Sequence, residues 1–215
     1  MDKISRPYLC LVTDRSLCPP DELSERIEYA VKGGVNLIQV REKDIEDDEV
    51  AILTKGIKPA IQDKAIITIN THINAAVSSR ADGIHLPEDF MSVKEARTLL
   101  PTNMIVGKSV HSLSNAIFQS QNGADYITLG TIFPTSSKPG ANTLGLSMVT
   151  EISGKVTCPL LAIGGINPTN VKSTISAGAD GVAVISSILT DSNPEKAART
   201  LKNSMAEAWQ NQRKI

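Results

Sequence analysis

The sequence predicts a single (β/α)8 barrel, a TIM barrel, formed by one domain that spans residues 1–215. Eight short apolar, β-branched runs alternate with segments of helical periodicity. Such alternation is typical of a parallel sheet whose strands are connected by helices. The length of 215 residues suits one barrel with a full hydrophobic core. Glycine-rich turns after the last two runs are also typical of this fold.

The predicted strands are short, and several are apolar at nearly every position. Strands of a parallel barrel are buried on both faces, so a continuous apolar run fits them better than an alternating pattern. We expect strands at residues 8–13, 37–41, 65–70, 83–86, 104–110, 126–130, 160–164 and 181–185.

The predicted helices lie between and after these strands. Gly33, Gly123 and Gly178 each follow a periodic segment, as glycine commonly does at the end of a helix. We expect helices at residues 21–32, 47–62, 73–79, 93–100, 112–122, 147–153, 168–177 and 194–212.

Composition and charge argue against several classes of protein. Lys and Arg number 22 against 23 Asp and Glu, with no basic run, so we expect no nucleic-acid partner. We expect no membrane association, because no apolar run approaches the roughly 18 residues of a membrane span and the first residues lack a signal peptide's apolar core. Cys10, Cys18 and Cys158 lack metal-like spacing and fit a reduced, cytoplasmic protein.

Turns of small residues follow the last two predicted strands. Gly164 and Gly165 end the seventh strand, and Ile185 and Ser186 follow the eighth. Backbone N–H groups in such turns approach an anion closely, and the following helix adds partial positive charge. We therefore expect these four residues to bind the phosphate of a small phosphorylated substrate.

Polar side chains lie at or just after the ends of the other predicted strands, at the end of the barrel where active sites lie. All three histidines of the chain belong to this set. Residues 131–144 form a long loop rich in Pro, Gly and small polar residues, which we expect to act as a lid. The predicted ligand-facing residues are Gln39, Arg41, Lys43, Asn70, His72, His85, Ser109, His111, Thr131, Thr135 and Lys138.

Basic residues in this set indicate an anionic ligand. Arg41 and Lys43 are two positions apart, so on a strand they face the same side. Inward-facing cations are costly unless they meet an anion. The alternative is an ion pair with Glu42 or Asp44. Lys138, in the lid, either is solvated or reaches a phosphate when the loop closes.

Several motifs occur together in a consistent order between about residues 8 and 205. They are Gln39-Val40-Arg41-Glu42-Lys43, Gly83-Ile84-His85-Leu86, Ser109-Val110-His111-Ser112, residues 130–138, Ile163-Gly164-Gly165-Ile166 and residues 178–186. In these segments the chain resembles the thiamine phosphate synthase/TenI superfamily. The resemblance implies a (β/α)8 barrel and a role in thiamine biosynthesis.

Synthases of this superfamily join two substrates: a hydroxymethylpyrimidine diphosphate loses pyrophosphate and is captured by a thiazole phosphate. The resemblance implies that Gly165, Ile185 and Ser186 hold the thiazole phosphate through backbone N–H groups and that Thr135 contacts ligand from the lid. It also implies that the pyrimidine and its diphosphate are held by Gln39, Arg41, Lys43, Asn70, Ser109 and Lys138.

Two positions depart from the synthase pattern. Synthases carry magnesium-binding aspartates where this chain has Thr71 and Phe90. Glu88 and Asp89 lie just upstream of Phe90, and a shifted turn would let Asp89 replace the missing ligand. Because magnesium neutralises the leaving diphosphate, the loss of both aspartates argues against a synthase.

These departures, together with Leu86-Pro87 and Gly145-Leu146-Ser147, favour a TenI-like thiazole tautomerase, which moves a proton without a metal. The base of the best-matching pattern would stand at Thr131, so the candidate catalytic residues are His72, His85 and His111. This hypothesis predicts no cofactor.

Two alternatives remain open at this point. One is a thiamine-phosphate synthase, the only case in which Mg²⁺ is expected. The other is a non-catalytic protein, either one that binds a phosphorylated ligand or a regulatory protein. The resemblance also leads us to expect a homodimer.

Overall fold

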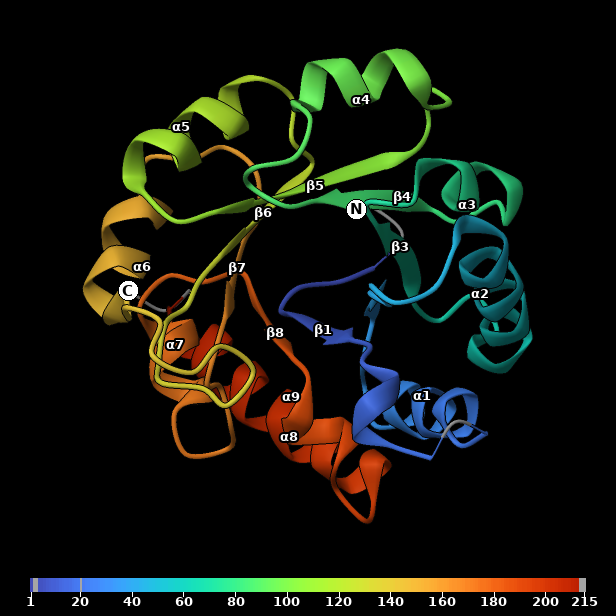
Figure 1. Ribbon diagram of the computed structural model, residues 1–215. Coiled ribbons are helices and arrows are strands. Elements are labelled where there is room, and N and C mark those ends of the chain that lie inside the picture. Colours follow the sequence, from blue (N-terminus) through green and yellow to red (C-terminus); the bar gives the residue numbers. More distant parts are fainter. Residues whose placement is uncertain (2–3, 20, 213–215) are drawn as a thin grey trace.

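The computed structural model describes residue 1, residues 4–19 and residues 21–212; the rest of the predicted 1–215 domain lies outside the described residues. Within the described part, eight parallel strands pair in chain order, and β1 also pairs with β8. The strands thus close into a barrel, which the helices surround (Figure 1). The predicted (β/α)8 barrel is confirmed.

The strands are four to six residues long. Five of them end one residue before the predicted position, because the residue at that position has already left the strand ladder and entered a loop. The strands are β1 Tyr8–Val12, β2 Leu37–Val40, β3 Ile66–Asn70, β4 Gly83–Leu86, β5 Ile105–Val110, β6 Tyr126–Leu129, β7 Leu160–Ile163 and β8 Gly181–Val184.

Helices follow the strands close to the predicted positions. Two short ones, η1 Arg15–Leu17 and α8 Ser186–Leu189, were not expected, because three or four residues are too few to show helical periodicity. The others are α1 Leu23–Lys32, α2 Asp47–Ile61, α3 Ile73–Ser78, α4 Val93–Leu99, α5 Leu113–Gln121, α6 Gly145–Ser153, α7 Val171–Ser176 and α9 Pro194–Gln212.

The largest boundary difference is at α7, predicted to begin at residue 168. Asn167 Oδ1 accepts a hydrogen bond from Thr169 N at 2.9 Å, and Asn170 Oδ1 accepts one from Asn167 N at 2.9 Å. These bonds hold residues 167–170 in a turn and compete with helical hydrogen bonds. The helix therefore begins only at Val171.

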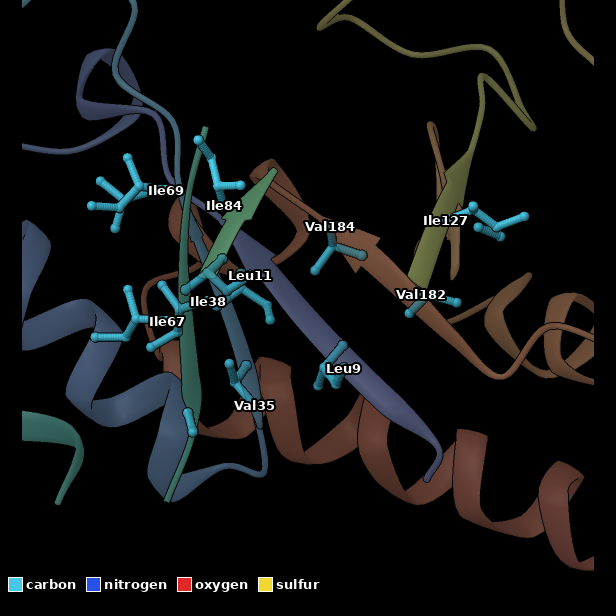
Figure 2. Close-up of a cluster of buried hydrophobic side chains, with 14 of the residues drawn as sticks. Leu9, Leu11, Val35, Ile38, Ile67, Ile69, Ile84, Ile127, Val182 and Val184 are labelled. Atoms are coloured by element: carbon cyan, nitrogen blue, oxygen red, sulfur yellow. The ribbon is translucent and has the colours of Figure 1, made fainter. Parts of the chain in front are cut away.

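Side chains of each strand alternate between two packing layers. Leu9 and Leu11 belong to the outer layer, which also contains Ile38 and Val182 (Figure 2) and fills the space between strands and helices. Tyr8, Cys10 and Val12 belong to a smaller inner cluster with Leu37, Ile66, Tyr126, Leu161 and Ala183. The inner cluster fills the barrel at its amino-terminal end, so the carboxyl end is free for a ligand.

Among the described helices, none combines the length and apolar character that crossing a bilayer requires.

Candidate functional site

A cavity of about 720 Å³ lies at the carboxyl ends of the strands. Every predicted site residue except His72 lines it. The structure therefore brings together Gln39, Arg41, Lys43, Asn70, His85, Ser109, His111, Thr131, Thr135, Lys138, Gly164, Gly165, Ile185 and Ser186. Their individual roles stay predictions.

His72 lies apart from the other two histidines. Its Nδ1 is 2.6 Å from Asp47 Oδ1, so the ring bridges the start of α3 and the start of α2. His72 does not line the cavity. Its position in the sequence, directly after a strand, did not reveal that the side chain turns toward a neighbouring helix.

Basic side chains form one wall of the cavity. Arg41 and Lys43 come from the end of β2, and Lys138 comes from the β6–α6 loop. The charge of Arg41, followed by burial and the charge of Lys138, lowers the pKa of Lys43. Mutual repulsion of this kind is relieved when an anion binds between the cations. This wall is therefore suited to a multiply charged anion.

The alternative for Arg41 and Lys43, an ion pair with Glu42 or Asp44, does not form, because Arg15 binds both carboxylates. Arg15 Nε lies 3.2 Å from Glu42 Oε2, and Arg15 Nη2 lies 2.9 Å from Asp44 Oδ2. Among the described residues, no ion pair involves Arg41, Lys43 or Lys138. Their charges are available to a ligand.

Backbone turns form a second wall of the cavity. Gly164 and Gly165 have φ values of 103° and 64°, the left-handed region that favours glycine. A Cβ atom on Gly165 would lie 2.3 Å from the Pro134 carbonyl oxygen, so no larger residue fits without a shift. Ile185 and Ser186 lie at the start of α8 and line the same wall. This wall offers backbone N–H groups to an anion without a basic side chain.

The β4–α4 loop carries two acidic residues, Glu88 and Asp89, to the cavity and is fixed by Lys108, which was not among the predicted site residues. Lys108 is 1% exposed. Its Nζ donates hydrogen bonds to the carbonyl oxygens of Pro87 at 2.7 Å, Phe90 at 3.2 Å and Met91 at 3.0 Å. The three donors of the ammonium group thus hold the loop at three points. A lysine inside an apolar strand was the available signal.

Glu88 and His111 form a hydrogen-bonded pair at the rim. His111 Nδ1 lies 2.6 Å from Glu88 Oε2, and the Nδ2 group of Asn115 also donates to Glu88. Burial favours a higher pKa for Glu88, but the hydrogen bonds from Asn115 and His111 leave the pKa below its usual value. Glu88 is therefore an ionised partner of His111, and its oxygens are already engaged.

His85 is buried below the rim. Its Nε2 lies 2.9 Å from Ser109 Oγ, and its Nδ1 lies 3.0 Å from Tyr126 Oη. Burial, followed by the charges of Lys108 and Arg41, lowers the pKa of His85 to about 3. The imidazole is therefore neutral near pH 7. Tyr126 was not among the predicted site residues, since its aromatic ring looked like ordinary core.

Thr71 and Phe90, the two departures from the synthase pattern, both lie outside the cavity lining. The Thr71 hydroxyl donates to the Asn70 carbonyl oxygen at 2.7 Å, and the residue has a φ of 61°. Phe90 is 41% exposed. Neither side chain lines the cavity, so neither contributes an oxygen ligand there.

The donor set of the cavity allows at most a lightly held metal ion. In the part of the chain that the structure describes, no group of three His, Cys, Asp or Glu residues could hold one. Asp14 accepts from Ser16 N at 3.1 Å, and Glu88 is engaged by His111. The Asp89 carboxylate has no hydrogen bond or ion pair with another described residue and lies near enough to Lys43 to influence its pKa. Because Mg²⁺ is commonly held by one or two carboxylates and substrate phosphates, Asp89 fits such an ion when a diphosphate is bound.

Comparisons with known proteins agree with one another. A family model described as thiamine monophosphate synthase matches residues 9–188. A thiamine-phosphate synthase of Clostridium novyi is 38% identical over 197 residues, which cover 91% of this chain and 97% of that protein. One of Chlorobium limicola is 38% identical over 199 residues, covering 92% and 93% respectively.

A solved structure gives the same result. Thiamine phosphate pyrophosphorylase from Pyrococcus furiosus is 32% identical to this chain and matches it with a TM-score of 0.85, over 94% of this chain and 96% of that one.

These relatives overturn the predicted thiazole tautomerase. Curated proteins that are 37–38% identical over at least 90% of this chain carry the name thiamine-phosphate synthase. The tautomerase prediction gave more weight to Thr71 and Phe90 than to the similarity of the remaining chain. By its match to the family model and its similarity to these relatives, the chain belongs to the thiamine monophosphate synthase family.

Proposed function

We propose that the chain is a thiamine-phosphate synthase. The observation that carries the proposal is a single cavity lined by two different sets of groups that suit anions. One wall has Arg41, Lys43 and Lys138, and the other has the backbone turns at Gly165 and Ser186. A synthase needs both, because a pyrimidine diphosphate and a thiazole phosphate must be held at once. The curated relatives support the same activity.

The proposed reaction exchanges one bond for another at a methylene carbon. The C–O bond between the pyrimidine methylene and the diphosphate breaks, and its electron pair leaves with pyrophosphate. The lone pair of the thiazole ring nitrogen forms the new C–N bond to the same carbon. No proton is removed from the nitrogen, so the reaction requires no general base.

The protein's contribution is therefore to orient two anions and to stabilise the leaving charge. Arg41, Lys43 and Lys138 face the diphosphate, where negative charge builds up as the C–O bond breaks. Gly165, Ile185 and Ser186 hold the thiazole phosphate on the wall formed by the backbone turns. Gln39 and Asn70 come from adjacent strands, β2 and β3, and are placed to contact the pyrimidine ring. Thr135 lies in the loop that carries Lys138 and closes with it.

Magnesium belongs to this proposal through Asp89. Bound Mg²⁺ supplies positive charge that makes the diphosphate a better leaving group. Asp89 would hold it together with diphosphate oxygens. Because Thr71 and Phe90 supply no oxygen ligand to the cavity, the three cations carry more of the charge neutralisation.

The test combines hydroxymethylpyrimidine diphosphate, thiazole phosphate and Mg²⁺ with the purified protein. Pyrophosphate and thiamine phosphate are expected in equal amounts, and only when both substrates are present. Lys43→Met is expected to lower kcat/KM at least tenfold, since it removes a hydrogen bond or ion pair to a charged group. Lys55→Met, on the exposed face of α2, is the matched control and should retain activity. Equal activity of Lys43→Met and wild type would contradict the assignment of the cationic wall.

A homodimer and a cytoplasmic location remain part of the proposal. Size-exclusion chromatography with light scattering tests the former, and a mass of one chain of 23.0 kDa would contradict it.

A further inference from the structure

A network of hydrogen-bonded polar groups, all of them buried except the half-buried Ser109, connects four consecutive strands at the floor of the cavity. It connects Thr68 of β3, His85 of β4, Ser109 of β5 and Tyr126 of β6. His85 and Tyr126 are 2% and 0% exposed. Gly107 makes room for the phenol, because a Cβ atom there would lie 2.1 Å from Tyr126 Cζ. Of these four residues, His85 and Ser109 line the cavity, whereas Thr68 and Tyr126 do not.

Each side chain of this network has a fixed number of hydrogens that it can donate in hydrogen bonds. Burial raises the pKa of Tyr126, so the phenol keeps its proton. His85 is neutral, because burial and the nearby charges of Lys108 and Arg41 oppose protonation. A neutral imidazole has one N–H group and one lone pair. The tautomer of His85 therefore decides the direction of its hydrogen bonds to Tyr126 and Ser109.

Two directions are possible. In the first, Tyr126 donates to Nδ1, Nε2–H donates to Ser109, and the Ser109 hydroxyl hydrogen is free for a ligand. In the second, Ser109 donates to Nε2, Nδ1–H donates to Tyr126, and Ser109 offers a ligand only oxygen lone pairs. The two directions make Ser109 a donor or an acceptor toward whatever occupies the cavity.

Two structural facts favour the first direction. Thr68 Oγ1 already donates to the Ile38 carbonyl oxygen at 3.2 Å, so in the second direction Tyr126 would have to donate across 3.4 Å to Thr68 or turn to the Gln39 side chain, with which it also interacts. In the first direction it donates to Nδ1 at 3.0 Å. An imidazole nitrogen is also a better acceptor than a phenol oxygen, whose lone pair is shared with the ring.

We propose that His85 is a positioning residue, held as the Nε2–H tautomer by Tyr126, that keeps the hydroxyl hydrogen of Ser109 free to bind an anionic oxygen. The inference rests on the proposed function in taking that oxygen to be one of the diphosphate. Ser109 then adds a neutral donor to the cationic wall. His85 itself neither accepts nor releases a proton during turnover.

The tautomer can be observed directly. In protein labelled with ¹⁵N-histidine, two-bond ¹⁵N–¹H correlations distinguish the two neutral tautomers, and the chain has only three histidines. The His85 signals are identified by their loss in His85→Gln. We expect an Nε2–H pattern that does not titrate between about pH 6 and pH 8, the range in which an exposed imidazole changes charge. An Nδ1–H pattern would overturn the proposal.

Binding of inorganic pyrophosphate, measured by calorimetry at one fixed Mg²⁺ concentration, tests the effect on the ligand. Ser109→Ala should weaken binding about tenfold, as expected for a lost hydrogen bond to a charged group. If Ser109 were an acceptor, the same variant would bind pyrophosphate equally well or more tightly, which would also overturn the proposal.

His85 variants separate positioning from a general loss of structure. His85→Asn is too short to reach Ser109 and should weaken pyrophosphate binding, whereas His85→Gln, whose amide N–H reaches further, should retain part of it. In a Ser109→Ala background, His85→Asn should cause no further loss. An equal loss in both backgrounds would show that His85 acts only on the fold.

The outcomes keep the two proposals apart. A protein that binds pyrophosphate through a donor Ser109 but forms no thiamine phosphate would contradict the proposed function and leave the tautomer assignment intact. A protein that forms thiamine phosphate while Ser109→Ala binds pyrophosphate normally would contradict the tautomer assignment alone.

Discussion

The buried ammonium of Lys108 lies 2.7 Å from the carbonyl oxygen of Pro87 and makes two further hydrogen bonds to the same loop. This contact joins β5 to the loop that brings Asp89 to the cavity. The position of Asp89, the carboxylate proposed to hold magnesium, thus depends on a residue that does not line the cavity.

Lys108→Met should both destabilise the protein and loosen this loop. The variant leaves three carbonyl oxygens without their donor, which is expected to cost roughly 2–4 kcal/mol in the free energy of unfolding. Urea denaturation measures that cost, and hydrogen exchange at residues 87–91 reports the loop. Lys94→Met, at an exposed position of α4, serves as control. Unchanged exchange in Lys108→Met would refute the anchoring role.

Thr71→Asn should stabilise the protein. Thr71 has a φ of 61°, where a β-branched residue is strained and asparagine is better tolerated. The gain is expected to be about 0.5–1 kcal/mol, since the hydroxyl bond to the Asn70 carbonyl oxygen is lost in exchange. Thermal unfolding measures it. Thr200→Asn, in the helical backbone of α9, should not stabilise, and a similar gain there would disprove the explanation.

Asp89→Asn should raise the Mg²⁺ requirement. Removal of the one available carboxylate is expected to raise the Mg²⁺ concentration for half-maximal synthesis about tenfold. It should also reduce the amount by which Mg²⁺ strengthens pyrophosphate binding. Titration with Mg²⁺ after chelation gives both values. Asp48→Asn, exposed on α2, provides the comparison, and identical Mg²⁺ curves for the two variants would exclude Asp89 as a ligand.

Lys202 should make stability depend on pH. Its Nζ donates to the Pro7 carbonyl oxygen at 2.6 Å, and burial lowers its pKa to about 8 from the ordinary lysine value of 10.5. Between these values the unfolded chain binds more protons than the folded one, so the free energy of unfolding rises with pH. This contribution is complete above the unfolded pKa and is lost as pH falls through about 8.

Urea denaturation of wild type and Lys202→Met at several pH values across this window isolates the contribution of Lys202. Wild type should gain stability relative to the variant as pH rises. A constant difference between the two proteins would rule out the shifted pKa.

The sequence was sufficient for the barrel and for most of the cavity wall. Short apolar runs placed the strands within one residue of the observed bounds, and polar residues near strand ends such as Gln39 and Ser109 line the cavity as expected. This worked because a parallel barrel brings all strand ends to one rim, whatever the details of packing.

Other features depended on contacts that no local pattern contains. His72 and His85 both lie near the end of a strand, yet His72 pairs with Asp47 on a neighbouring helix. Lys108 and Tyr126 lie inside apolar strands, where only tertiary packing shows that they fix a loop and a histidine. The reaction was mispredicted because two substituted positions outweighed the similarity of the whole chain.

The most direct test of the synthase proposal is the reaction of wild-type protein with both substrates and Mg²⁺, followed by mass spectrometry and a pyrophosphate assay. The proposal predicts thiamine phosphate and pyrophosphate in a one-to-one ratio, with neither formed when thiazole phosphate is omitted. Folded protein that binds both substrates and yields no thiamine phosphate would contradict it.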